Sequence, residues 1–134
     1  MKKLVIVSSM CILFSSFNST AKSSSIISQC DDKNSERAEY SQCLDLVKIK
    51  IDRELETWEN NQLFILEDIA KTTGRQSAYN MFKRAQKNFI TYRDNNCKWQ
   101  FLAQLPSNDS APAFKECYIL TTKDRINELS RLNK

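Results

Sequence analysis

Residues 40–69 read YSQCLDLVKIKIDRELETWENNQLFILEDI. Apolar side chains recur in this stretch three or four positions apart, with one polar interruption at Gln62, at positions 40, 44, 47, 51, 55, 58, 65 and 69. Such spacing follows one face of an α-helix, whereas a half-buried strand alternates every second residue. The stretch therefore predicts a long amphipathic helix.

The ends of this first helix are marked by the residues on either side. Ser35 is suited to cap its start, with the Glu36 carboxylate near the positive end of the helix dipole. Gly74 is suited to end it, because glycine readily adopts the left-handed conformation found at helix ends. A helix of about 37 residues would be about 55 Å long at its rise of 1.5 Å per residue.

A second helical stripe follows Gly74 and fades near Gln104, before Pro106. Its positions are Ala78, Phe82, Ala85, Phe89, Tyr92, Asn96 and Trp99. Trp58 and Trp99 each lie on one of the two stripes. We therefore expect both to be core residues rather than binding anchors.

A third helix is expected after Pro106. Asp109 or Ser110 can cap it, and Pro112 falls in its first turn, where the missing N–H costs nothing. Its apolar positions include Phe114, Tyr118, Ile119, Ile126, Leu129 and Leu132. Because the connection at Gly74 is short, the first two helices should pack antiparallel. The expected fold class is all-α: a small disulfide-stapled helical bundle with a long antiparallel helical hairpin plus a third C-terminal helix.

The N-terminus has the pattern of an export signal. Two lysines precede a mostly apolar run over residues 4–14, and small residues at 19–21 suit a signal peptidase. The apolar run is about half the ~20 residues that a membrane span requires. We expect residues 1–21 to be a cleaved signal peptide, residues 22–134 to form a single helical domain, and the product to be periplasmic or secreted.

Cleavage also makes the cysteine count even. Cys11 leaves with the signal, and Met10 before it does not fit a lipid-attachment site, so no membrane anchor is expected. The cysteines that remain are Cys30, Cys43, Cys97 and Cys117. Four cysteines in a small exported chain predict two disulfides. A zinc site is the weaker interpretation, because the chain has no CxxC pair and no histidine.

The disulfide pairing is argued from helix geometry. Cys97 and Cys117 are equidistant from the turn at residues 106–110, so two antiparallel helices folded about that turn bring them side by side. Cys43 and Cys97 lie at unequal distances from Gly74, which fits the required Cα separation of under about 7 Å less well. We favour Cys97–Cys117 and Cys30–Cys43 over the two other connectivities.

Composition argues against nucleic-acid binding and against catalysis. Loss of Lys2 and Lys3 lowers the formal net charge from +4 to +2, which carries no signature of nucleic-acid binding. The absence of histidine excludes Ser-His and Cys-His nucleophile pairs. Acidic residues along the first helix lie beside lysines on a polar face, and nothing in their pattern indicates a shared apolar cleft. We therefore predict a protein that is not an enzyme, with no catalytic residue, no metal and no cofactor.

One side of the second helix carries polar residues at helical spacing. Gln86, Ile90, Arg93 and Cys97 are each three or four positions from the next. Arg93, one turn before a bridged cysteine, is suited to hold an acidic side chain, because its planar guanidinium makes two parallel hydrogen bonds. We favour this role in docking the helices over direct contact with a target, and Arg125 has the same two interpretations.

The second half of the chain resembles the LprI-like family of secreted bacterial lysozyme inhibitors. The residues that carry the resemblance are Gln86, Phe89, Tyr92, Arg93, Asp94, Cys97, Cys117, Leu120, Thr121, Arg125 and Leu129. Phe89 stands where the family usually has Trp. In the first half, Cys30, Glu39 and Cys43 and the segment 52–55 are similar to the family pattern. Residues 105–112 replace a Gly-Gly-Ser that the family often has between its last two cysteines.

The resemblance implies an exported inhibitor of a lysozyme-type cell-wall muramidase, which acts by steric blockade through a disulfide-braced surface. Its partner would be a lysozyme or another peptidoglycan hydrolase. The candidate contact loop is Ser107, Asn108, Asp109 and Ser110. Two alternatives remain open: a periplasmic immunity protein against a secreted peptidoglycan hydrolase toxin, and a non-enzymatic envelope interaction module.

Overall fold

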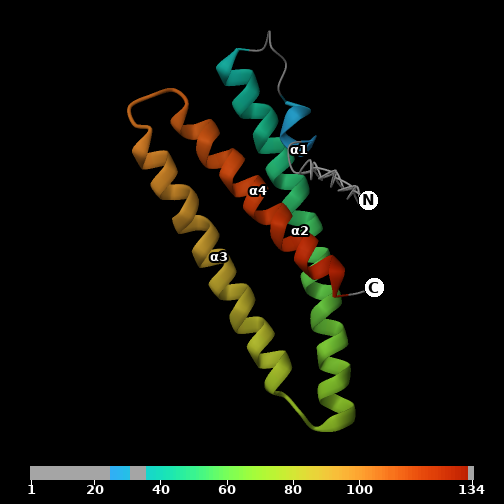
Figure 1. Ribbon diagram of the computed structural model, residues 1–134. Helices are drawn as coiled ribbons and strands as arrows, with labels where there is room; N and C mark the ends of the chain where they lie inside the picture. Colours follow the sequence, from blue (N-terminus) through green and yellow to red (C-terminus); the bar gives the residue numbers. More distant parts are fainter. Residues whose placement is uncertain (1–24, 31–35, 133–134) are drawn as a thin grey trace, which may run out of the picture.

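The computed structural model describes residues 25–30 and 36–132, which form four helices. These are α1 (Ser25–Ser28), α2 (Arg37–Thr73), α3 (Ser77–Ala103) and α4 (Ser110–Arg131). Figure 1 shows α2 and α3 meeting at the turn around Gly74 and separated at their other ends by α4. The described part of the chain is thus all-α, with the expected antiparallel hairpin and a third long helix. The expected signal peptide, residues 1–21, lies outside the described residues.

The predicted end of the first long helix is confirmed. Gly74 has φ 72° and its N–H donates to the Ala70 carbonyl at 2.9 Å, which ends α2 in the left-handed conformation. At the other end Glu36 occupies the cap position with no side-chain cap hydrogen bond, and the expected cap Ser35 lies outside the described residues. Asp109 precedes α4 without capping it through its side chain.

The core lies where α4 packs against α2. Its buried apolar residues are Cys30, Leu44, Val47, Ile51, Leu55, Ile119, Ile126 and Leu129. Each such aliphatic side chain stabilises the fold by about 1.5–3 kcal/mol when fully buried. Trp58 packs against this cluster and is half-buried, as expected of a residue on the first stripe.

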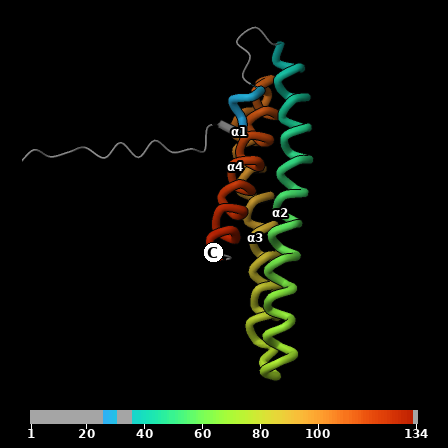
Figure 2. The backbone as a smooth tube through the Cα atoms, turned by 90° about the vertical axis from the view of Figure 1, so that its right-hand side faces the viewer, coloured from blue at the N-terminus to red at the C-terminus, as the bar shows by residue number. Residues whose placement is uncertain are grey.

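The first stripe is buried only along the part of α2 that α4 covers. Ile65 and Ile69 are 37% and 43% exposed, because the hairpin continues past the C-terminal end of α4 (Figure 2). Leu132, expected to be an apolar position of the third helix, is 63% exposed just beyond the last residue of α4. The exposure of Ile65 and Ile69 arises because α4 is shorter than the hairpin on which it packs.

The prediction from the second stripe was partly wrong: Phe82 and Phe89 pack against the core, but Tyr92 and Trp99 face outward. Trp99 and Tyr92 are 58% and 60% exposed, whereas Gln86, Arg93 and Cys97 are buried. This inward face is polar because side chains of α2 and α4 supply its hydrogen-bond partners. Trp99 is therefore not a core residue.

Two disulfides close the structure, in the two favoured pairings. Cys30 is joined to Cys43 with a Cα–Cα distance of 5.6 Å, and Cys97 to Cys117 with a distance of 5.5 Å. The first attaches the α1 segment to α2, and the second joins α3 to α4. Among the described residues, no helix is both long enough and apolar enough to span a bilayer.

Candidate functional site

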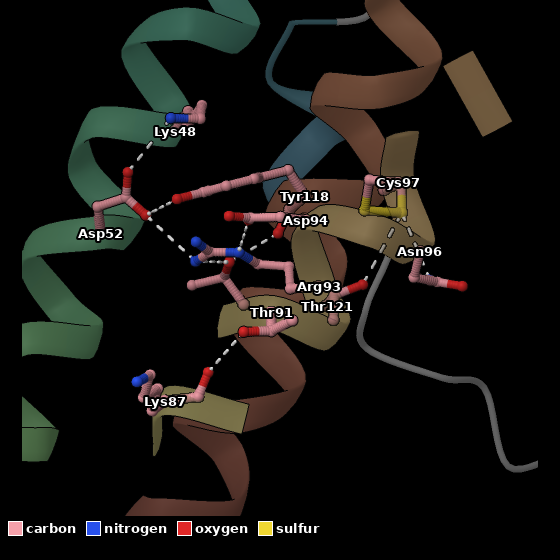
Figure 3. A network of polar contacts seen from close by, with 12 residues as sticks. Lys48, Asp52, Lys87, Thr91, Arg93, Asp94, Asn96, Cys97, Tyr118 and Thr121 are labelled. Atoms are coloured by element: carbon pink, nitrogen blue, oxygen red, sulfur yellow. Dashed lines mark hydrogen bonds and ion pairs between the residues drawn. A yellow bond between two sulfur atoms is a disulfide. The ribbon is translucent and has the colours of Figure 1, made fainter. Parts of the chain in front are cut away.

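A buried cation lies at the junction of the three long helices. The Arg93 side chain, from α3, is only 5% exposed. Its Nε donates to Asp94 Oδ1 at 3.1 Å and its Nη1 donates to Thr122 Oγ1 at 3.3 Å. Nη1 also lies 3.8 Å from Asp52 Oδ1 of α2 (Figure 3). One guanidinium thus connects α3 with both neighbouring helices.

Tyr118 of α4 completes this junction. Its ring centroid is 3.7 Å from the Arg93 guanidinium carbon, and Lys48 Nζ lies 4.2 Å from the same centroid. The Tyr118 hydroxyl donates to Asp52 Oδ1 at 2.9 Å. Burial, and then the hydrogen bond to Asp52, raise the pKa of Tyr118 well above its usual range. The phenol therefore stays protonated at neutral pH, which suits it to holding Asp52 in place rather than to proton transfer.

A second polar connection joins α3 and α4 nearer the hairpin turn. Arg125 Nε donates to Gln86 Oε1 at 2.7 Å, and its Nη2 contacts the same oxygen. Arg125 Nη1 also pairs with Glu128 at 2.6 Å, and its guanidinium lies 5.7 Å from the Phe89 ring centroid. Gln86 Nε2 is buried, and none of the described residues offers it a hydrogen-bond partner. Both arginines of the family motif are thus engaged within the bundle.

The remaining motif residues divide into inward and outward ones. Leu129 is fully buried, Leu120 is half-buried, and the Thr121 hydroxyl lies 4.0 Å from Cys117 Sγ. Asp94 is 53% exposed although it pairs with Arg93. Tyr92 points outward. Of the motif, only Tyr92 is a large side chain presented mainly to solvent.

The candidate loop between α3 and α4 is held by its own hydrogen bonds. The Ser107 N–H donates to Gln104 O at 2.8 Å, and the Asp109 N–H donates to Ser107 Oγ at 3.1 Å. The Asp109 carboxylate pairs with Arg37 of α2. Ser110 is only 6% exposed, so it is unsuited to target contact, because burial removes it from the surface. Ser107, Asn108 and Asp109 are the loop residues that remain exposed.

A hollow of about 590 Å³ adjoins this loop. It is lined by Glu36, Arg37, Ala38, Ser41, Asn108, Ala111 and Pro112, from the first turns of α2 and α4 and the loop. Further polar contacts join α2 and α4 at this end: Tyr40 donates to Glu116 at 2.8 Å, and Lys115 pairs with Asp45 at 2.7 Å. The loop therefore sits on a firmly connected end of the bundle.

Sequence reasoning missed the partners of the buried Arg93. The Arg93 site is completed from other helices by Asp52, Tyr118 and Thr122. Nothing in the sequence spacing between these residues and Arg93 predicts that they contact it. The available signal was local: Tyr118 and Thr122 are one helical turn apart, as are Lys48 and Asp52. Among the described residues, no group of three or more His, Cys, Asp or Glu side chains is placed to hold a metal ion.

Comparison with known proteins finds a family model that matches most of the chain. The model of the family described as "Lysozyme inhibitor LprI" matches residues 30–129, which include both disulfides, Arg93 and Arg125. Neither a curated protein nor a solved structure matches the chain significantly.

Proposed function

The chain belongs to the LprI lysozyme inhibitor family, and from that premise we propose that it is an exported protein inhibitor of a lysozyme-type cell-wall muramidase. The match over residues 30–129 is the observation that carries this proposal. It covers α2, α3 and most of α4, so the family pattern corresponds to the whole helical bundle rather than to one segment.

The proposed mechanism is steric blockade without chemistry of its own. Arg93 contacts Asp52 and Tyr118, and Arg125 contacts Gln86, so both arginines are engaged inside the bundle. These contacts and the Cys97–Cys117 bridge hold α3 and α4 in one arrangement. A surface that is already ordered loses less entropy on binding, which favours tight inhibition by a small domain.

Export is part of the proposal. Residues 1–21 have the pattern of a cleaved signal, and two disulfides fit an oxidising compartment such as the periplasm. A cell-wall hydrolase acts in that same compartment, so inhibitor and target would meet there.

The test is an inhibition assay with the disulfide-bonded protein, purified from the envelope fraction of cells that express the full chain. Muramidases of several structural types are incubated with it, and the clearing of a cell-wall suspension is followed. We expect at least one type to be inhibited at or below micromolar concentration. Unchanged turnover of every type at micromolar protein would reject the proposal.

A further inference from the structure

The solvent-facing side of α3 carries a continuous uncharged stripe, here called the α3 ridge. It consists of Ala78, Met81, Ala85, Asn88, Tyr92, Asn95, Trp99 and Leu102. These residues follow one another three or four positions apart, as in the contact seam of a coiled coil, and all eight are exposed. The large members, Met81, Tyr92, Trp99 and Leu102, are 57%, 60%, 58% and 54% exposed.

The ridge is not explained by the packing of the bundle. The α3 residues that pack against the core are Phe82, Phe89 and Ile90, and none of them belongs to the ridge. The helix thus directs Arg93 inward and Trp99 outward, the reverse of the usual distribution. A line of exposed apolar side chains of this kind marks a surface that another molecule covers.

The composition of the ridge suits a protein partner. Tyr, Trp and Met are enriched in the centres of protein interfaces, where charged residues are depleted. Trp99 is also oriented in advance, because its Nε1 donates to Asn96 Oδ1 at 3.1 Å. Anchors held in one rotamer lose little entropy on binding.

The charges beside the ridge indicate the sign of the charge on the partner's surface. Within α3 there are five basic residues and one acidic residue, Asp94, which is engaged with Arg93. Arg84, Lys87 and Lys98 are exposed along one flank of the ridge. A second copy of α3 would bring these like charges together, which is unfavourable. In α2, by contrast, eight acidic residues outnumber five basic ones.

An enzyme that cleaves within a polysaccharide chain binds several sugars in a row, so its cleft is elongated. Such a cleft also carries a pair of carboxylates at its centre. A convex helix about 32 Å long from Met81 to Leu102 matches that shape, and its basic flank matches that charge. Resting on the proposed function, we propose that the α3 ridge is the surface that enters the substrate cleft of the muramidase, with Tyr92 and Trp99 as its main anchors.

The closing experiment compares inhibition constants of variants at exposed positions, each checked for an unchanged thermal melt. The double substitution Tyr92→Ala with Trp99→Ala should weaken inhibition by roughly 100-fold or more, because two central aromatic anchors are lost. The matched control is Phe64→Ala, which removes an aromatic side chain that is 72% exposed on α2 and should change inhibition by less than about twofold.

A charge reversal tests the flank. The pair Arg84→Glu with Lys98→Glu should weaken inhibition by roughly tenfold at low salt and reduce its salt dependence, because complementary charge mainly accelerates association.

Three outcomes would overturn the inference. If the unmodified protein inhibits and the Tyr92/Trp99 double variant inhibits equally well, the ridge is not the contact surface, and the proposed function stands. If the unmodified protein inhibits no muramidase, both fail. If sedimentation shows a dimer that the double variant dissociates, a second copy covers the ridge instead.

Discussion

Arg93 shows how a single side chain can fix the relative position of three helices. Its charge is buried, and its partners come from α2 and α4 as well as from the next residue of α3. Substituting Arg93→Ala leaves Asp52 without this cation and Tyr118 without its stacked partner. We expect the free energy of unfolding to fall by about 3 kcal/mol, the lower end for breaking a buried pair, because Asp52 is 37% exposed.

Urea unfolding followed by circular dichroism measures this loss. Arg84→Ala is the matched control, since Arg84 lies on the same helix with an exposed side chain, and it should cost less than about 0.5 kcal/mol. Equal effects of the two substitutions would show that Arg93 does not fasten the helices.

Tyr118 gives a pH dependence whose sign follows from its protonation. Its pKa is raised in the folded state, so above about pH 10 the folded chain binds more protons at this site than the unfolded chain. The contribution of Tyr118 to the free energy of unfolding is fully present below that pH and declines as pH rises. At neutral pH, Tyr118→Phe should cost about 1 kcal/mol through the lost hydrogen bond to Asp52.

As pH rises above about 10, the stabilities of the wild type and Tyr118→Phe should therefore converge. The other tyrosines and lysines are common to both proteins, so their titration cancels in the difference between the two free energies of unfolding. Urea midpoints measured at intervals from pH 7 to about pH 11 provide the test. A gap that stays constant over that range would show that the Tyr118 phenol is not shifted.

At the scale of the elements, the turn between α2 and α3 depends on one residue. Gly74 has φ 72°, and a Cβ built there meets no atom within 4 Å, so any cost of substitution comes from the backbone alone. Gly74→Ala should lower the free energy of unfolding by about 1 kcal/mol. Gly74→Asn should cost less, because asparagine tolerates this conformation better. Thermal melts of the two variants that showed no such order would contradict this account.

Helix ends could be read from the sequence, but the inward face of α3 could be read only in part. Gly74, Pro106 and Pro112 act locally, so their effect needs no knowledge of the fold. Apolar spacing placed Phe82 and Phe89 correctly against the core, but it also favoured Trp99, which is exposed. The helical spacing of Gln86, Arg93 and Cys97 indicated that Arg93 docks the helices, but it could not identify Asp52, 41 positions away in the chain, as the counter-charge. A polar buried face is defined by partners from other helices, and periodicity within one helix does not contain them.

At the scale of the whole molecule, the length of α4 relative to the hairpin decides which apolar residues are covered. Ile65 and Ile69 continue the helical spacing of Leu44 to Leu55, so the sequence assigns them to the same face. They remain partly exposed because α4 ends before reaching them. The disulfide pairing, by contrast, followed from the equal distances of Cys97 and Cys117 from their turn, a property of antiparallel geometry alone.

The two disulfides should contribute similar amounts of stability but restrain different parts of the molecule. They close loops of 13 and 20 residues, for which chain entropy predicts about 3 kcal/mol each. Together this is comparable with the net stability of a small domain, so the fully reduced chain should lose its cooperative melt.

Replacing Cys30 and Cys43 by Ser should speed amide exchange mainly in α1 and the first turns of α2. Replacing Cys97 and Cys117 by Ser should speed exchange at the joined ends of α3 and α4, where the candidate loop lies. Hydrogen exchange that rose equally throughout the chain in both variants would show that the bridges act only on the unfolded state.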